Sequence, residues 1–287
     1  MRWNSLFATA AICLGAPALA GAAPIVVDGP TTGWTPVLYT SVTPDFADDQ
    51  RTGIPEADIV GDLSHAAFYT AFDDAGTGSL TDGILGFRIR IGAEKTPAGF
   101  SQVAVVGIDA NLDGALDLFV LVDHSGANQI AIYNAGSGAN TSPSTTTISA
   151  TGLTYLETAT NYDWSVVDST IDPPATDFDV DNDGDTDWFV SFTVPFQDVA
   201  TQLGVLGIAG VDQNTTLRYV VGTSTQANAL NQDLGGPNGG TSSTTSWTAL
   251  GAMSIATGAA GAVPEPATAS MLALGLLGLA FCGRRGR

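Results

Sequence analysis

Ile84-Leu-Gly-Phe-Arg-Ile-Arg-Ile91 alternates apolar side chains with glycine and arginine. Successive side chains of a β-strand point to opposite faces, so a period of two residues is typical of a strand with one buried face. One face of this segment is apolar (Leu85, Phe87, Ile89 and Ile91), and the other carries Arg88 and Arg90. The segment is therefore predicted to be a strand that packs one face against a core.

Short apolar runs of the same kind recur along the chain, with turn residues such as 123–128 between them. They are Ala66–Phe72, Val103–Ile108, Leu118–Val122, Gln129–Tyr133, Tyr162–Val167, Trp188–Val194 and Leu217–Val221. Only Pro195–Leu203 and Thr225–Asn231 are expected to be helical. Many short strands with glycine-rich turns predict an all-β fold, a β-sandwich or jelly roll with one or two short helices. Through this pattern and Phe192-Thr-Val-Pro-Phe196, the domain loosely resembles jelly-roll carbohydrate-binding modules.

Two aspartate-rich segments share one spacing, D-x-[DN]-x-D-G-x-x-D, and each runs directly into a predicted strand. Loop 1 is Asp109-Ala-Asn111-Leu-Asp113-Gly-Ala115-Leu-Asp117, and loop 2 is Asp179-Val-Asp181-Asn-Asp183-Gly-Asp185-Thr-Asp187. Calcium takes six to eight oxygen ligands, and side chains at positions 1, 3 and 5 of a tight loop converge on one point. Position 7 would supply a backbone carbonyl (Ala115 or Asp185), and position 9 a further oxygen (Asp117 or Asp187). We therefore expect one or two calcium ions here.

Position 12, where an EF-hand has its bidentate glutamate, is Val120 in loop 1 and Val190 in loop 2. The flanking segments are also predicted strands, not helices. The loops resemble the calcium loops of thrombospondin type 3 repeats and dockerins more than an EF-hand. Asp177 and Asp123 are candidates for the missing ligand, on sequence proximity alone. The alternative interpretation is a pair of aspartate-rich turns without metal.

The C-terminal 25 residues have three parts in a fixed order. Pro264-Glu265-Pro266 is followed by an uncharged run over 267–282 and then by Arg284, Arg285 and Arg287. The prolines keep Glu265 extended, and the arginines favour the cytoplasmic side of a membrane. This tail resembles the PEP-CTERM sorting signal, which exosortases process in Gram-negative bacteria. An ordinary C-terminal membrane anchor is the alternative.

The N-terminus has the features of a secretory signal peptide: Arg2, an apolar run and the small-residue end Ala18-Leu-Ala20, with cleavage after Ala20 or Ala23. The two cysteines, Cys13 and Cys282, lie in the targeting segments, so disulfides are not expected to stabilise the mature domain. The expected organisation is a signal peptide (1–23), a calcium-loop sandwich (24–233), a Gly/Ser/Thr-rich spacer (234–262) and the sorting signal (263–287).

The resemblance of the tail implies export through an inner-membrane intermediate, with the membrane contacted only through a transient C-terminal helix. It further implies cleavage by an exosortase and delivery to the cell surface or the extracellular matrix of a biofilm. The chain has 29 acidic and 9 basic residues, a formal net charge of −20. Such a charge disfavours nucleic acid as a partner and favours cations.

No recognisable catalytic motif is present, so an enzyme is not expected. The two histidines form no metal-ligand pair, and there is no G-x-S-x-G nucleophile elbow. Two functional classes remain: a structural or adhesive surface protein stabilised by calcium, and a carbohydrate-binding module that retains exopolysaccharide. A polysaccharide-active enzyme is a distant third. A groove lined by exposed tryptophan or tyrosine with nearby asparagine and glutamine would favour the carbohydrate-binding class.

Overall fold

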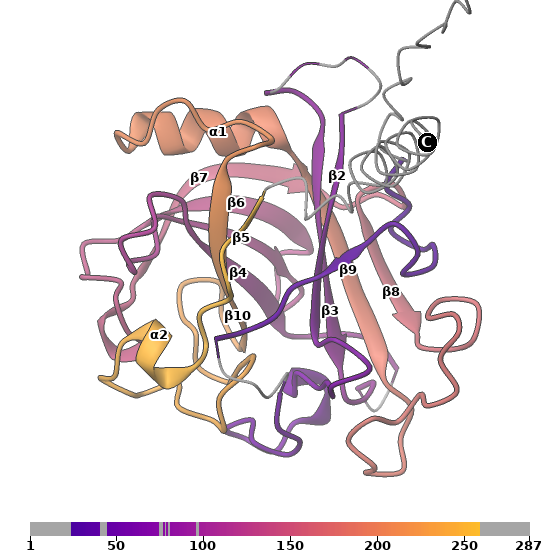
Figure 1. Ribbon diagram of the computed structural model, residues 1–287. Coiled ribbons are helices and arrows are strands. Elements are labelled where there is room, and N and C mark those ends of the chain that lie inside the picture. Colours follow the sequence, from indigo (N-terminus) through magenta and orange to yellow (C-terminus); the bar gives the residue numbers. More distant parts are fainter. Residues whose placement is uncertain are drawn as a thin grey trace, which may run out of the picture. The chain divides into compact units, whose positions relative to one another are not determined.

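The computed structural model describes residues 24–40, 45–74, 77, 79, 81–95 and 98–258 (Figure 1). Gly21–Ala262 form one compact unit. The predicted signal peptide and sorting signal fall outside the described residues. Within the described residues, no helix combines the length and the apolar character needed to cross a membrane.

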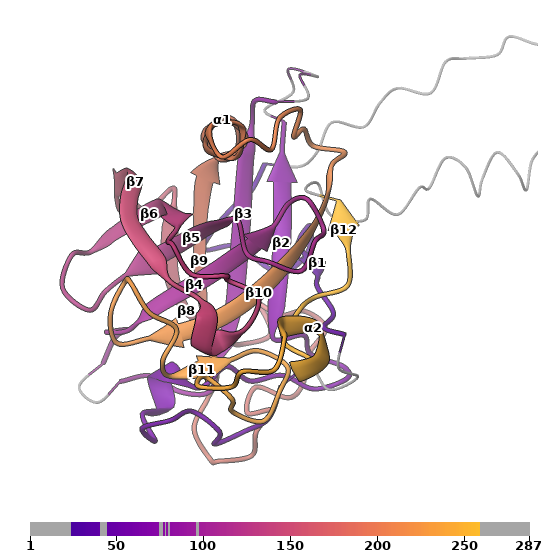
Figure 2. The ribbon, with the colours of Figure 1, turned by 90° about the vertical axis from the view of Figure 1, so that its left-hand side faces the viewer.

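Two antiparallel sheets make up the fold, which confirms the predicted all-β sandwich (Figures 1 and 2). The first sheet has the order β1 (Thr35–Pro36), β2 (Phe68–Asp73), β3 (Ile84–Ile91), β9 (Trp188–Pro195) and β8 (Tyr162–Val166). The second has the order β11 (Asp233–Leu234), β10 (Thr216–Ser224), β4 (Val103–Asp109), β5 (Leu118–Asp123), β6 (Gln129–Ala135) and β7 (Ile148–Leu156). The short strand β12 (Thr257–Gly258) pairs with β10.

The main core lies between the two sheets. The alternation in β3 is confirmed, because Leu85, Phe87, Ile89 and Ile91 all belong to this core. Phe87 packs against Phe192 of β9 and Tyr219 of β10, so aromatic rings bridge the sheets. The helix α1 (Phe196–Val205) adds Phe196, Val199 and Leu203 to the same core, which agrees with the helix predicted near Pro195–Leu203.

The outer faces of both sheets are also covered, so β4 and β5 are buried on both sides. Residues near the C-terminal end of the described chain, with Trp247 at their centre, cover the seven-stranded sheet. On the five-stranded sheet, Trp34 and the segment that contains Ile171 and Phe178 pack on Phe189. Burial of this kind explains why several strands are apolar runs and not strict alternations.

Arg88 and Arg90 point to the outer face of β3 as predicted, but both side chains are fully buried beneath this cover. Arg88 donates hydrogen bonds to Ser191 Oγ and to the carbonyls of Val27 and Gly29, each at 2.8 Å. Its guanidinium lies 4.4 Å from the centre of the Trp34 ring. The arginines therefore fasten the covering segments to the sheet.

Two expectations from the sequence are wrong. Thr225–Asn231 forms turns and bends, not a helix, and the Asn231 side chain accepts hydrogen bonds from Ser224 and Thr225. Residues 234–258 are part of the packed domain, not a flexible spacer, because Trp247, Ala252 and Met253 are completely buried there. Near Trp247 the chain forms a helical turn, α2 (Trp247–Leu250), with Ser246 as its N-cap. The small residues of this segment allow close packing, which composition alone did not reveal.

Candidate metal centres

Loops 1 and 2 adopt similar backbone conformations, although they adjoin strands of different sheets. Loop 1 connects β4 to β5, and loop 2 leads into β9. Leu112 and Asn182, at position 4, both have positive φ angles, of 63° and 61°. Gly114 and Gly184, at position 6, also have positive φ, of 88° and 98°. Glycine at position 6 fits because it takes this conformation without steric cost.

Four hydrogen bonds recur at equivalent positions of the two loops. In each hydrogen bond a side-chain oxygen accepts from a backbone N–H. The side chain at position 1 accepts from the N–H of position 6, and the side chain at position 3 accepts from the N–H of position 5. The side chain at position 5 accepts from the N–H of position 7, and the side chain at position 9 accepts from the N–H of position 2. In loop 1 the acceptors are Asp109, Asn111, Asp113 and Asp117, at 2.8 to 3.1 Å. In loop 2 they are Asp179, Asp181, Asp183 and Asp187, at 2.7 to 3.5 Å. The repeat read from the sequence is thus a repeat of local structure.

Loop 2 brings three carboxylates together. Asp179, Asp181 and Asp187 each present an oxygen, and these oxygens lie within 4.8 Å of one another. Burial, with the neighbouring Asp179 and other loop carboxylates, raises the pKa of Asp181 to about 8. Burial also raises the pKa of Asp187 to about 6, although Arg90 opposes that rise. Negative charge in this loop is therefore poorly balanced by protein groups alone.

Asp187 is fully buried and uses its two oxygens differently. Its Oδ2 accepts a hydrogen bond from Arg90 at 2.7 Å and a second from the Val180 N–H at 3.3 Å. Its Oδ1 is buried and has no hydrogen-bond partner. A buried carboxylate oxygen without a partner is costly, and a bound cation would remove that cost.

Loop 1 is similar in shape but less charged. Asp109 is fully buried, and its Oδ1 likewise lacks a hydrogen-bond partner. Burial raises the pKa values of Asp109 and Asp117. At position 3, however, Asn111 replaces a carboxylate, and its amide donates to Asp113 at 3.1 Å. Loop 1 therefore offers a cation fewer charged ligands than loop 2.

The two residues considered for the missing ligand differ in their positions. Asp123 is the last residue of β5, at the opposite end of that strand from loop 1, and its carboxylate accepts from Ser125. It is too far along the strand to complete loop 1. Asp177 is exposed, precedes loop 2 and accepts from the Asp179 N–H at 3.3 Å. Ala115 and Asp185 occupy position 7 of their loops, and Asp185 is exposed.

A third group of carboxylates was missed in the sequence. Asp49, Asp58 and Asp233 also present oxygens within 4.8 Å of one another. Burial raises the pKa of Asp58 to about 7 and that of Asp233 well above its usual range. No local spacing connects these residues, since Asp233 lies far from the other two along the chain, so only the tertiary structure reveals the group.

The predicted sorting-signal residues, Pro264, Glu265, Pro266, Arg284 and Arg285, lie outside the described residues. The described unit is an all-β sandwich with two equivalent aspartate-rich loops. Residues 262–285 match the PEP-CTERM protein-sorting motif. The chain therefore carries an exosortase sorting signal and is an exported protein that passes through a membrane-anchored intermediate. No curated protein and no solved structure matches it.

Proposed function

We propose that this chain is a non-catalytic protein of the cell surface or biofilm matrix, with a structural or adhesive role and a sandwich stabilised by calcium in loops 1 and 2. The observation that carries the proposal is the unpartnered, buried Oδ1 of Asp187 beside Asp179 and Asp181. The sorting motif supports the location, because it directs the chain to export.

The chemistry of the loops favours calcium over other metals. Their donors are carboxylates, one amide and backbone carbonyls, with no histidine or cysteine in either loop. Hard oxygen donors suit calcium and magnesium, and a flexible set of more than six oxygens suits calcium better. Extracellular calcium is abundant enough to occupy sites with dissociation constants of about 10⁻⁴ to 10⁻³ M.

Thermal unfolding with and without calcium tests this function. A ligand at 100 times its dissociation constant stabilises a folded protein by about 2.7 kcal/mol. For a domain of this size that corresponds to a rise in Tm of roughly 5–10 °C. We expect a rise of up to this size with 10 mM calcium, and we expect Asp181→Asn to reduce it, because the change gives loop 2 the lower charge of loop 1. Asp28→Asn, at an exposed aspartate outside the loops, is the matched control.

The outcome that would contradict the proposal is a Tm that calcium does not change in the wild-type protein. Magnesium at the same concentration should stabilise less, because it demands near-octahedral geometry and gives up its water reluctantly.

Carbohydrate binding is the second candidate, and one surface feature favours it. Trp188 lines a hollow of about 420 Å³ together with Glu94, Lys95, Asp185 and Thr186. Trp188 is partly exposed and stacks on Trp164 at 5.1 Å, so its ring is held in a fixed orientation. A rigid aromatic face beside polar side chains can stack on a sugar ring.

The larger hollow, of about 660 Å³, offers less to a sugar. Its aromatic residues Trp34, Tyr39 and Tyr69 are mostly buried, and no asparagine or glutamine lines it. That hollow therefore gives the carbohydrate-binding role no support. A glycan-binding screen decides between the structural role and the carbohydrate-binding role: binding that Trp188→Ala abolishes would establish the second candidate.

A further inference from the structure

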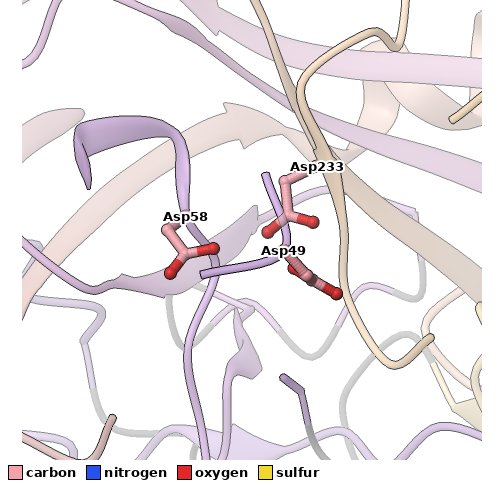
Figure 3. A group of neighbouring side chains, drawn as sticks. All are labelled: Asp49, Asp58 and Asp233. Carbon is pink, nitrogen blue, oxygen red and sulfur yellow. The ribbon is translucent and has the colours of Figure 1, made fainter. Parts of the chain in front are cut away.

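Asp49, Asp58 and Asp233 come from three separate parts of the domain. Asp49 lies in the segment that follows β1, Asp58 ends the short helical turn η1 (Pro55–Ala57), and Asp233 begins β11. Figure 3 shows their carboxyl groups turned toward one another, and one oxygen of each lies within 4.8 Å of the others. Asp58 and Asp233 are buried, with exposed fractions of 2% and 0%.

Among the described residues, no basic side chain forms a salt bridge with this group. The salt bridges within the described part of the chain involve His65, His124 and Arg90, and none reaches the three aspartates. The charges that act on Asp58 come from Asp49 and Asp48, and they add to the rise in its pKa. Three carboxylates this close together, two of them buried, would repel strongly without a cation between them.

Three buried oxygens in and beside the group have no hydrogen-bond partner: Asp49 Oδ1, Asp58 Oδ1 and Asp45 Oδ2. Asp58 Oδ2 accepts from the Asp48 N–H at 2.9 Å, whereas its Oδ1 is unpartnered. Asp45 adds an independent observation. Asp45 is buried, with an exposed fraction of 6%. Its Oδ1 accepts a hydrogen bond from the Gly236 N–H, and its Oδ2 has no hydrogen-bond partner. Asp233 and Asp49 are the charges that act on Asp45, so Asp45 faces the same group.

We propose that Asp49, Asp58 and Asp233 bind a hard divalent cation, with calcium as the first candidate, and that Asp45 completes the negative shell around it. Every donor is an oxygen, and this disfavours zinc and copper, which prefer nitrogen and sulfur ligands. The site is separate from loops 1 and 2 and shares no residue with them.

The cation would fasten the beginning of the domain to its end. The same segments already meet through neutral contacts: the Arg51 N–H donates to the Gln232 carbonyl at 2.8 Å, and Thr52 Oγ1 donates to Gln232 Oε1 at 2.5 Å. Asp233 Oδ2 also accepts from the Ile59 N–H at 2.7 Å. A bound cation would add a charged link across segments more than 170 residues apart in the sequence.

The site also adjoins loop 2. A Cβ atom placed on Gly92 would lie 2.7 Å from Asp181 Oδ2 and 3.7 Å from Asp58 Oδ2. Loop 2 and the group around Asp58 therefore lie on either side of the same glycine, and ions in the two sites would be neighbours.

Native mass spectrometry of the full chain in calcium tests the proposal by counting bound ions. We expect Asp58→Asn to reduce the calcium count by one relative to the wild type, while the exposed Asp28→Asn leaves it unchanged. The test uses the difference in count, so it is valid whether or not loops 1 and 2 bind calcium. An unchanged count in Asp58→Asn would overturn the proposal.

Thermal unfolding gives a second readout that guards against simple misfolding. In chelator, Asp58→Asn removes a repelling charge and keeps the shape of the side chain, so we expect its Tm to equal or exceed that of the wild type. In calcium, we expect its Tm to fall below the wild-type value. A variant that is equally destabilised with and without calcium would show that Asp58 is only structural.

Discussion

Gly92 is the residue at which two of the acidic groups meet. A methyl group at this position would lie 2.7 Å from Asp181 Oδ2, closer than real contacts allow, and 3.0 Å from Val60 Cγ1, which is a tight contact. Because Asp181 would be held by an ion in the proposed state, it could not turn aside without losing that ion.

We therefore predict that Gly92→Ala lowers stability by about 1–3 kcal/mol, as overpacking does elsewhere. We also expect it to weaken calcium binding at loop 2. Gly126→Ala is the control, since a methyl group there meets no atom within 4 Å. Urea unfolding in calcium checks the prediction, and equal midpoints for the two variants would contradict it.

The buried aspartates also predict an unusual dependence of stability on pH in calcium-free protein. The pKa of Asp58 is raised to about 7 and that of Asp181 to about 8, so the folded state holds protons that the unfolded state has released. The free energy of unfolding is then highest near pH 4 and falls as the pH rises through 7 to 8.

Each unit of pKa shift corresponds to about 1.4 kcal/mol, and solvent screening of the half-buried Asp181 reduces its share. Melts in chelator from pH 4.5 to pH 8 should show Tm falling with pH, and Asp58→Asn should flatten the slope. A Tm that rises over this range would contradict the prediction. Calcium should reverse the trend, because it binds the ionised carboxylates.

At the scale of elements, Arg90 connects strand β3 to the two segments that cover it. Its side chain pairs with Asp187 at 2.7 Å and with Asp172 and is fully buried. It also lies 5.0 Å from the centre of the Phe189 ring on β9. The strand, loop 2 and the covering segment therefore depend on one guanidinium group.

We predict that Arg90→Met destabilises the calcium-free protein by about 3–5 kcal/mol, because it leaves two carboxylates without their partner. Lys95→Met, at an exposed position of the same region, should change stability by less than about 0.5 kcal/mol. Guanidinium unfolding in chelator measures both. A small loss in Arg90→Met would mean that the pair contributes little beyond its desolvation cost.

Local patterns in the sequence predicted the elements well where the relevant residues are close in the chain. The alternation of Leu85, Phe87 and Ile89 marked the core face of β3, and the spacing from Asp179 to Asp187 marked a tight turn before a strand. The outward face of β3 was read as polar, although Arg88 is buried by segments that no local pattern could place there. The group of Asp49, Asp58 and Asp233 could not be predicted from the sequence for the same reason, because only tertiary contacts bring these residues together.

At the scale of the whole molecule, the sandwich needs the residues that were expected to be a spacer. Trp247 is fully buried against the outer face of the seven-stranded sheet, and its Nε1 donates to the Asn140 carbonyl at 2.8 Å. Composition misled here because small residues are typical both of linkers and of closely packed loops.

We predict that a chain truncated after residue 258 keeps its stability, whereas one truncated after residue 233 does not fold. The milder change Trp247→Ala should cost about 3–5 kcal/mol through the cavity it leaves. Thr248→Ala, at the exposed neighbouring position, is the control. Circular dichroism melts distinguish these variants, and a cooperative transition in the chain ending at residue 233 would refute the prediction.

The position of β10 in the second sheet has a consequence for translocation. This strand comes late in the sequence but lies between β4 and β11, and β12 pairs with it as well. A chain threaded through the membrane from its N-terminus would expose β4 to β7 long before β10 emerges. The sheet would remain incomplete until the sorting signal itself reaches the membrane, so the anchored intermediate is the stage at which the domain can first close.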